Sequence, residues 1–301
     1  MSDNVVVITG AAKGIGQALA RKLSVTYRVA MLDRNADEVT QAAAEIGDRA
    51  LAVPCDISDQ QAVDAAIADV IETFGRIDVA VSNAGIGTAG VARHLDPDAL
   101  AAQLDINLTG NWRFIHACLP HLERTRGYIL GVASAAAIMG PPAEAFYAAS
   151  KAGFEALLDT VRVEVASLGI GVGVAYLMFI DTPLVRAGDQ IHPDLAALRE
   201  SMPGPAAKTY PVAAAVDAIT KAIDGRKRTA FVPNSLRLQY LLRSIVRPVI
   251  DKSFRDVVPR IDALTKEKVD KLGPYDAAFG RPTTRRRSTE PVLAPEDTGH
   301  R

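Results

Sequence analysis

Short apolar runs alternate with longer segments of mixed apolar and polar residues along most of the chain. The short runs are rich in Val, Ile and Leu and predict buried strands, whereas apolar positions spaced by three or four residues predict helices. The predicted strands cover residues 4–9, 27–32, 50–53, 77–82, 128–132 and 171–177. The predicted helices between them cover residues 15–24, 36–46, 59–74, 97–121 and 143–167. This alternation predicts an α/β fold, a doubly wound parallel sheet of the Rossmann type with right-handed crossovers and helices on both faces.

The pattern is looser after residue 181. Helices are predicted over residues 184–202, 212–224, 236–254 (with an interruption at Pro248) and 257–271, and a last strand over residues 229–232. We therefore predict a single Rossmann-type domain over residues 1–233 and a basic amphipathic helical extension over residues 234–279. Residues 280–301 are rich in Pro, Arg, Thr and Ser and are expected to form a disordered tail.

The composition excludes a disordered or fibrous chain, because 49% of the 301 residues are apolar and 23% are charged. The formal net charge of −1 is unevenly distributed: residues 1–225 hold 17 Lys and Arg against 26 Asp and Glu, whereas residues 226–301 hold 17 against 9. The basic last quarter predicts a partner or a surface role of its own. The three arginines at 285–287 are too short a run to indicate nucleic-acid binding, and we expect none.

Two cysteines, Cys55 and Cys118, cannot form a disulfide framework, and both lie in apolar stretches that predict buried thiols. The N-terminal residues lack a basic region followed by a long apolar one, so no signal peptide is expected. No run of about 18 uncharged apolar residues predicts a membrane span. The histidines show no ligand spacing. We expect a cytoplasmic protein without a metal site.

The first predicted turn, residues 9–16, reads TGAAKGIG and joins a strand to a helix. Glycines at 10, 14 and 16 let the backbone turn tightly and approach a pyrophosphate, and the helix that follows directs its free N–H groups at such an anion. Asp33 ends the second strand, where a carboxylate can accept both hydroxyl groups of an adenine ribose. That carboxylate repels a 2′-phosphate and favours NAD, whereas Lys13 and Arg34 can reach a 2′-phosphate and leave NADP open.

Tyr147 and Lys151 are four residues apart on a predicted helix, so their side chains share one face. The ordinary pKa of a phenol is about 10. A neighbouring ammonium group favours the phenolate, and we therefore expect Lys151 to lower the pKa of Tyr147 into the range that proton-transfer catalysis needs.

Together these residues resemble the short-chain dehydrogenase/reductase family over roughly residues 5–182. The matching motifs, in order, are TGAAKGIG at 9–16, Asp33, CDI at 55–57, SNAG at 82–85, DINLTG at 105–110, VASAAAI at 132–138 and YAASK at 147–151. The resemblance implies an NAD- or NADP-dependent oxidoreductase. It also implies a homodimer or homotetramer, assembled through the long helices at 97–121 and 143–167.

The resemblance assigns roles to individual residues. Tyr147 would exchange a proton with the substrate oxygen, Ser134 would hold that oxygen, and Lys151 would bind the nicotinamide ribose. Asn107 would anchor a water in a proton relay. The implied cofactor contacts are Gly10, Lys13, Gly14, Ile15, Gly16, Asp33, Arg34, Asp56, Ile57, Asn83, Ala84, Gly85, Tyr147, Lys151, Ile180 and Thr182.

One departure from the family pattern follows the sixth strand, where Leu177 and Met178 stand in place of the usual Pro-Gly. Segments that border the substrate in this family are apolar here, namely Ile138, Met139, Pro141, Pro142, Phe146, Met178, Phe179 and Leu184. We therefore expect a lipophilic secondary alcohol or ketone as substrate, and see no arginine clamp for an anionic group.

Residues 236–254 (LRLQYLLRSIVRPVIDKSF) interleave basic and apolar residues. Such a helix lies on an anionic membrane surface, or packs its apolar face on the core or on a second subunit. All three remain open. Two functional alternatives also remain: a catalytically weak dinucleotide-binding sensor or scaffold, which the Leu177–Met178 departure favours, and a methyltransferase with a similar glycine turn, which leaves the Tyr147–Lys151 pair unexplained.

Overall fold

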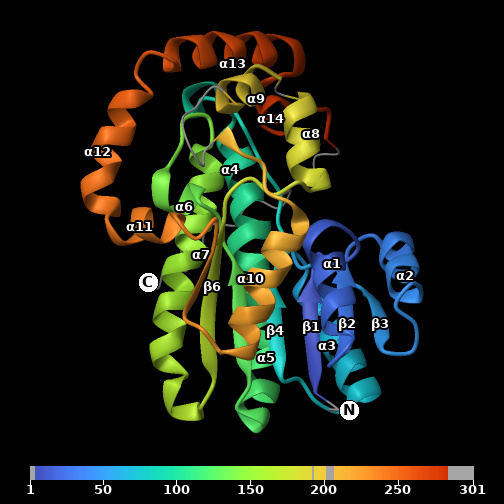
Figure 1. The fold of residues 1–301 in the computed structure, drawn as a ribbon. Helices are drawn as coiled ribbons and strands as arrows, with labels where there is room; N and C mark the ends of the chain where they lie inside the picture. Colours follow the sequence, from blue (N-terminus) through green and yellow to red (C-terminus); the bar gives the residue numbers. More distant parts are fainter. Residues whose placement is uncertain (1–3, 192, 201–206, 284–301) are drawn as a thin grey trace, which may run out of the picture.

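The computed structural model describes residues 4–191, 193–200 and 207–283. Seven parallel strands form one sheet in the order β3-β2-β1-β4-β5-β6-β7 (Figure 1). The strands are β1 (Val5–Thr9), β2 (Arg28–Asp33), β3 (Ala50–Pro54), β4 (Val79–Ser82), β5 (Tyr128–Val132), β6 (Gly171–Leu177) and β7 (Thr229–Val232). The predicted doubly wound parallel fold is therefore confirmed.

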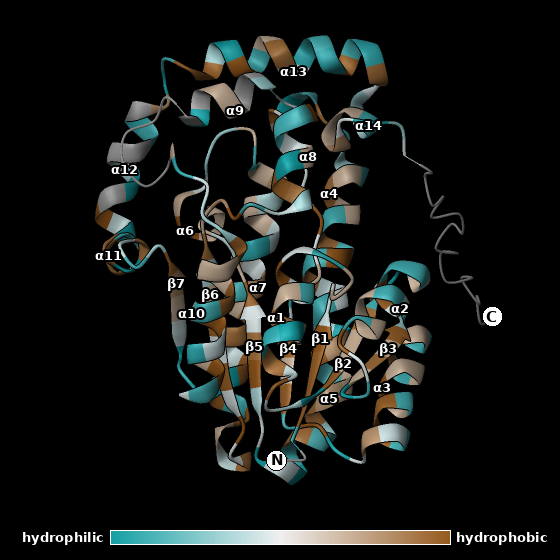
Figure 2. Cartoon of the chain, turned by 45° about the vertical axis from the view of Figure 1, so that its right-hand side comes forward, coloured by the Kyte–Doolittle hydropathy of each residue, from teal (hydrophilic) through white to brown (hydrophobic). Residues whose placement is uncertain are grey.

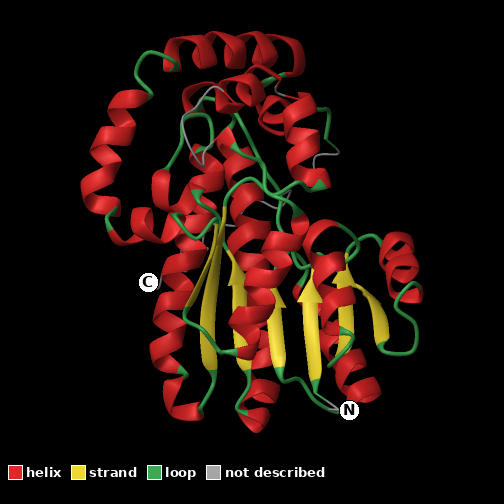
Figure 3. Cartoon of the chain, in the orientation of Figure 1, coloured by secondary structure: helices red, strands yellow, loops and turns green. Residues whose placement is uncertain are grey.

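Helices cover both faces of this sheet (Figure 3). One face carries α3 (Gln60–Phe74), α5 (Asn111–Thr125) and α7 (Ala145–Glu164), and the other carries α1 (Gly14–Leu23), α2 (Ala36–Ala44) and α10 (Val212–Asp224). Successive strand residues point to opposite faces. Val5 and Val7 accordingly join the core under the first set of helices, whereas Val6 and Ile8 join the core under the second. Figure 2 shows the apolar residues concentrated in the strands between these two layers.

The order of the strands fixes where a ligand can bind. The chain runs outward from β1 through β2 to β3 and then returns to start β4 on the other side of β1. In open parallel sheets, the crevice for a ligand lies at the carboxyl ends of the strands where the direction of winding reverses. Here that point lies between the ends of β1 and β4.

The long helix predicted at 97–121 is present but is not uniform. It consists of α4 (Pro97–Leu104), a π-helical segment η2 (Asp105–Gly110) and α5, which continues to Thr125. A π-helical turn inside a helix is often found at functional sites. The local reason is Asn107, whose buried side chain bonds the backbone of Ile86.

Six further helices are α6 (Ala136–Met139), α8 (Pro183–Ile191), α9 (Pro193–Glu200), α11 (Leu236–Leu241), α12 (Arg243–Ser253) and α13 (Val258–Leu272). The predicted interruption at Pro248 is wrong, because Pro248 lies inside α12 and the helix breaks at Leu242 instead. There the chain turns so that the Arg243 guanidinium reaches the carboxylate of Glu155 on α7, 2.7 Å away.

The last described helix, α14 (Pro274–Phe279), returns to pack on α4. Ala277 and Ala278 lie in a small apolar cluster with Leu95 and Ala99. The predicted disordered tail falls mostly on residues 284–301, which lie outside the described residues.

Both cysteines are buried and free, as predicted. Burial raises the pKa of the Cys55 thiol to about 12. Over the described ranges, no helix is long and apolar enough to cross a membrane. The same residues contain no group of three or more His, Cys, Asp or Glu side chains that could hold a metal ion.

Candidate active site

The glycine turn lies at the carboxyl end of β1 and leads into α1. Gly10 and Gly14 have φ values of +65° and +62°, which L-residues rarely adopt. A Cβ atom on Gly16 would lie 2.2 Å from the Gly10 carbonyl oxygen, so no larger residue fits there. Lys13, at the N-cap of α1, makes no side-chain capping bond. The turn therefore has the shape, and the helix start the free N–H groups, that a pyrophosphate requires.

Asp33 is fixed beside this turn. Its Oδ2 accepts a hydrogen bond from the Ala12 N–H at 3.2 Å, and its Oδ1 accepts one from the Asn35 N–H at 3.1 Å. The two candidate contacts for a 2′-phosphate are on the surface. Lys13 forms an exposed ion pair with Glu38 at 3.1 Å, and Arg34 is exposed.

The turn after β4 is bonded directly to the end of β1. Thr9 Oγ1 accepts hydrogen bonds from the N–H groups of Asn83 and Ala84, both at 3.0 Å. The Asn83 amide donates to the carbonyl oxygens of Thr9 and Gly10 at 2.9 and 3.2 Å. These bonds hold the two strand ends together at the point where the winding reverses, so the glycine turn has little freedom to move.

Ser134, Tyr147 and Lys151 meet at the ends of β5 and α7. The Ser134 hydroxyl lies near the Tyr147 hydroxyl and lowers the pKa of that phenol. The Lys151 Nζ lies 5.9 Å from the centre of the Tyr147 ring and donates to the carbonyl oxygen of Val132 at 2.9 Å. A Cβ atom on Gly85 would lie 3.6 Å from the same Nζ, so the ammonium group stands beside the turn after β4.

Asn107 is completely buried and fully bonded. Its Oδ1 accepts from the Ile86 N–H at 2.8 Å, and its Nδ2 donates to the Ile86 carbonyl at 2.9 Å and to Ser150 Oγ at 3.1 Å. Ser150 Oγ in turn donates to the Tyr147 carbonyl at 2.7 Å. Asn107 thus connects the turn after β4 to the helix that carries Tyr147.

The pKa of Tyr147 differs from the expectation. Burial, and next the nearby Glu144 carboxylate, raise the pKa of Tyr147 to about 12, against a hydrogen bond from Ser134 that lowers it. Burial lowers the pKa of Lys151 to about 8. The pKa of the phenol is therefore raised, against the expected lowering, because burial removes the phenolate from water and the Glu144 carboxylate repels it.

The remaining predicted contacts lie around the same crevice. Ile180 and Thr182 are buried, and a Cβ atom on Gly14 would lie 3.6 Å from Thr182 Cβ. Asp56 follows β3, and its Oδ1 accepts a hydrogen bond from Ser58 N–H at 2.9 Å. Ile57 is buried in the core.

Leu177 and Met178, which replace the family's Pro-Gly, prolong the sheet. The Leu177 carbonyl accepts from Ala135 N–H at 2.8 Å, and Met178 N–H donates to the Val232 carbonyl at 2.9 Å. Both side chains are buried. The departure therefore changes side chains without breaking the backbone pairing at this edge of the crevice.

The apolar residues expected to border a substrate do not form one set. Ile138 and Met178 belong to the main core, with Met139 and Phe179 packed against it. Phe146 packs on the apolar cluster beneath α14, and Leu184 is 49% exposed.

Two charged residues near Tyr147 were missed. Burial raises the pKa of Glu144 to about 7, against the Arg199 cation, which lowers it. Arg199 is 7% exposed, pairs with Asp189 at 2.8 and 2.9 Å, and stacks 4.6 Å over the Phe179 ring. No spacing in the sequence joins α9 to the start of α7, so only the three-dimensional fold brings these groups together.

Comparisons with known proteins agree with this geometry. The family model described as short chain dehydrogenase matches residues 4–190. Short-chain reductase protein NovJ of Streptomyces niveus is 33% identical over 215 residues, which are 70% of this chain and 80% of that protein. Trans-4-hydroxycyclohexanecarboxylate dehydrogenase of Sinomonas cyclohexanicum is 31% identical over 194 residues, or 61% of this chain and 75% of that protein.

Among solved structures, 3-ketoacyl-(acyl-carrier-protein) reductase from Brucella melitensis complexed with NADH is similar, with 27% identity and a TM-score of 0.68. The likeness covers 76% of this chain and 94% of that chain. The family match includes the glycine turn and the helix of Tyr147. The chain therefore belongs to the short-chain dehydrogenase family and is an oxidoreductase that acts on CH–OH or ketone groups with NAD or NADP.

Proposed function

We propose that this chain transfers a hydride between a nicotinamide cofactor and a lipophilic secondary alcohol or ketone, with Tyr147 as the general acid and base. The observation that carries the proposal is the meeting of Ser134, Tyr147 and the Lys151 ammonium group at the end of the sheet that holds the glycine turn. A substrate oxygen placed between the two hydroxyl groups would bond to both.

The cofactor's residues are proposed as follows. Gly10, Gly14 and Gly16 would contact the pyrophosphate, because the turn is so tight that a Cβ atom on Gly16 would have no room. Asp33 accepts the two hydroxyl groups of the adenine ribose, with Asp56 and Ile57 near the adenine. Lys151 binds the nicotinamide ribose, and Ile180 and Thr182 border the ring. When bound, the nicotinamide supplies the hydride chemistry. The carboxylate of Asp33 supports NAD over NADP, since it repels a 2′-phosphate.

The proposed proton transfer follows from the pKa values. With a pKa of about 12, Tyr147 is a protonated phenol at neutral pH, ready to donate its proton to a ketone oxygen as that oxygen gains negative charge. Lys151, with a pKa of about 8, is mostly cationic at pH 7 and stabilises the phenolate that remains. Removal of a proton from an alcohol uses the same groups in reverse.

Ser134 and Asn107 are proposed to hold other groups in position rather than to carry charge themselves. Ser134 Oγ accepts a hydrogen bond from the Ala136 N–H at 3.1 Å, which leaves its proton for the reacting oxygen. Asn107 fixes the Ile86 backbone, and we propose that a water held there relays protons between the Lys151 side and solvent, inward for ketone reduction and outward for alcohol oxidation.

A lipophilic substrate is supported by Met139 and Phe179, the two partly buried apolar residues of the segments that follow β5 and β6, whereas Ile138 and Met178 lie in the main core. The runner-up function is a catalytically weak dinucleotide-binding sensor or scaffold, which the Leu177–Met178 replacement supports.

A panel of lipophilic secondary alcohols and ketones, each with NAD and with NADP, tests the choice. Turnover with at least one pair and faster rates with longer apolar substituents are the expected results. Tight NADH binding without turnover of any pair would favour the sensor.

The proposed organisation is a catalytic and dinucleotide-binding unit over residues 1–233, followed by a helical extension over 234–279. We propose a homodimer or homotetramer that assembles through α5 and α7, which sedimentation equilibrium would measure. The free thiols of Cys55 and Cys118 support a reducing, cytoplasmic location.

A further inference from the structure

Helix α11 has two apolar faces, and only one of them packs on the core. Leu236 is 1% exposed and lies in the core. Tyr240, one turn later, packs its ring 5.0 Å from that of Tyr176 and 5.5 Å from that of Phe231. Packing on the core therefore accounts for Leu236 and Tyr240 of this helix.

The second face is apolar and exposed. Leu238, Leu241 and Ile245 are 62%, 66% and 72% exposed, and Leu242 between them is 39% exposed. These four residues, the outer apolar face, span the junction of α11 and α12, which lies at the outer edge of the molecule beyond β7 and α7 (Figures 1 and 2). Large side chains gathered in this way on a surface mark a site of contact.

Cations flank the outer apolar face. Arg237 and Arg247 are exposed, and neither has an ion pair within the described residues. Lys252 and Asp251 follow on α12, and both are exposed. Asp251 is the only acidic residue in α11 and α12, which together form the arm, so the arm carries an excess of positive charge.

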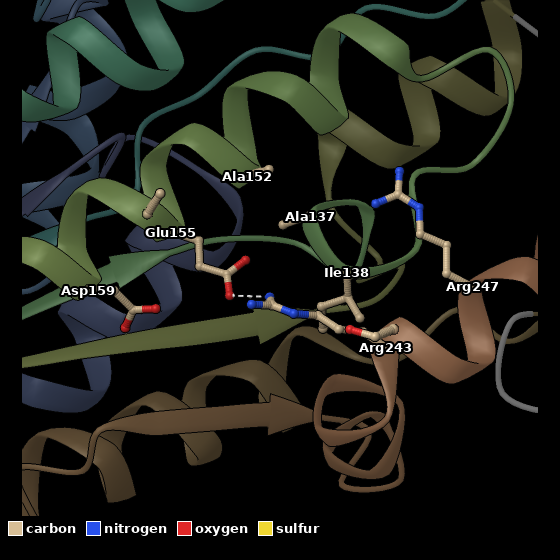
Figure 4. Close-up of a pocket in the computed structure, with 9 residues that line it drawn as sticks. Ala137, Ile138, Ala152, Glu155, Asp159, Arg243 and Arg247 are labelled. Carbon is tan, nitrogen blue, oxygen red and sulfur yellow. Dashed lines mark hydrogen bonds and ion pairs between the residues drawn. The ribbon is translucent and has the colours of Figure 1, made fainter.

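Arg243 has a different role from its neighbours. Its guanidinium donates to Glu155 Oε1 at 2.7 Å and lies 5.3 Å over the Tyr240 ring. This pair and Arg247 line a cavity of about 540 Å³ between α6, α7 and α12. Figure 4 shows the Arg247 guanidinium turned away from the pair. Arg243 thereby fixes the start of α12 to α7, the helix that carries Tyr147. The outer apolar face lies on this fixed segment.

Arg247 reaches the loop between α6 and α7. One of its guanidinium nitrogens lies 2.8 Å from where a Cβ of Gly140 would be. This loop follows Ile138 and Met139, which border the proposed substrate site. The cationic, apolar arm and the loop beside the substrate site are thus neighbours.

We propose that α11 and α12 form a docking surface for an anionic phospholipid bilayer. Leu238, Leu241, Leu242 and Ile245 enter the boundary of the acyl chains, and Arg237 and Arg247 bind the phosphates. Amphipathic helices with basic residues beside an apolar face bind membranes in this way. A chain docked so holds the loop at Gly140 near the bilayer, from which a lipophilic substrate would enter. Only this last step rests on the proposed function.

A second copy of the chain is a poorer occupant of this surface. In a two-fold symmetric contact the same patch lies on both sides. Arg237 and Arg247 of each copy would then face like charges, with Asp251 as the one carboxylate in the arm to offset them, and like charges across an interface are unfavourable. Anionic headgroups supply the opposite charge directly.

The test is vesicle co-sedimentation of the full chain, with vesicles of phosphatidylglycerol and phosphatidylcholine or of phosphatidylcholine alone. We expect binding to the anionic vesicles that weakens with salt. Arg237→Gln with Arg247→Gln should reduce the partition coefficient about 25-fold, since each cation near an anionic surface contributes about fivefold. Leu241→Ser with Ile245→Ser should reduce it by at least as much.

The matched control is Lys22→Gln with Val25→Ser, which removes one exposed cation and one side chain that is 72% exposed, both near the end of α1. This control should bind vesicles like the unaltered chain. Equal binding of all variants, or no preference for anionic vesicles, would overturn the proposal. So would conversion of an oligomer to a monomer by Leu241→Ser with Ile245→Ser, because the face would then be a subunit interface.

Measurement of oxidoreductase activity distinguishes a failure of the membrane-docking proposal from a failure of the proposed function. The arm variants should retain turnover of a water-soluble substrate without vesicles, whereas Tyr147→Phe should still bind vesicles.

Discussion

At the scale of single residues, the account depends on four side chains that charge and hydrogen bonding hold in unusual states. Tyr147 and Glu144 have raised pKa values because they are buried, Lys151 has a lowered one for the same reason, and Asn107 has every polar atom bonded. The sequence motifs identified three of the four. Glu144 was missed because a carboxylate three residues before Tyr147 carries no pattern of its own; its importance arises from burial beside Arg199.

The carboxylate of Glu144 should control the pH dependence of the reaction. Its pKa is about 7, so above that pH it is anionic and raises the pKa of Tyr147. Glu144→Gln removes this charge, and the apparent pKa of Tyr147 in the pH profile of kcat/KM for alcohol oxidation should fall. Glu164→Gln, at the exposed far end of α7, is the matched control and should leave the profile unchanged. An apparent pKa in Glu144→Gln that is equal to or higher than that of the unaltered chain would contradict this assignment.

Asp33 should determine the cofactor preference. Asp33→Asn keeps the shape but loses the charge that accepts two ribose hydroxyl groups and repels a 2′-phosphate. Hydrogen bonds to charged groups contribute about 1.5–3 kcal/mol, so the Kd for NADH should rise roughly tenfold or more while that for NADPH does not rise. Fluorescence titration measures both constants. Asp37→Asn, an exposed neighbour on α2, should change neither, and an unchanged NADH-to-NADPH ratio in Asp33→Asn would count against the role of Asp33.

At the scale of elements, periodicity predicted the strands well because buried parallel strands are short apolar runs. It failed where side chains override the local pattern. The π-helical segment η2 forms because Asn107 bonds Ile86, and the break at Leu242 accompanies the pairing of Arg243 with Glu155. Both contacts join residues far apart in the chain, so neither follows from a window of sequence.

Asn107→Ala should loosen the joint between η2 and the turn after β4. It removes the acceptor of the Ile86 N–H, and an unsatisfied buried group lowers the free energy of unfolding by about 1–3 kcal/mol. Urea denaturation should show this loss, whereas Asn234→Ala, in an exposed loop, should stay within about 0.5 kcal/mol. A loss no larger than that of Asn234→Ala would remove the structural role assigned to Asn107.

The Arg243–Glu155 pair should hold the arm to α7. The Glu155 side chain is 6% exposed, whereas that of Arg243 is 47% exposed and partly screened. Arg243→Met therefore leaves a buried carboxylate unpaired and should cost about 1–2 kcal/mol of unfolding free energy. Adding Glu155→Gln should restore most of it. Urea denaturation of the single and double variants measures the difference, and an additive double variant would show that the two groups do not interact.

At the scale of the whole molecule, the described part of the basic C-terminal quarter, residues 226–283, is folded back on the catalytic unit rather than separate from it. α14 packs on α4, and Lys268 on α13 donates to the Ile191 carbonyl at the end of α8 at 2.8 Å. The sequence predicted α13 and the positive charge of this region, but not α14. It left open where the segment 236–254 packs, because its apolar face fits the core, a second subunit or a membrane. The family match to residues 4–190 likewise says nothing of this extension.

The central claim is that Tyr147 exchanges the proton with a substrate oxygen held by Ser134, beside a bound nicotinamide. Tyr147→Phe tests it most directly, because the ring and its packing are kept and only the hydroxyl group is lost. We predict that kcat falls by 10²-fold or more, as expected for the loss of a general acid–base group, while the Kd for NADH stays within about twofold. Retention of most of the turnover, or loss of cofactor binding together with turnover, would contradict the account.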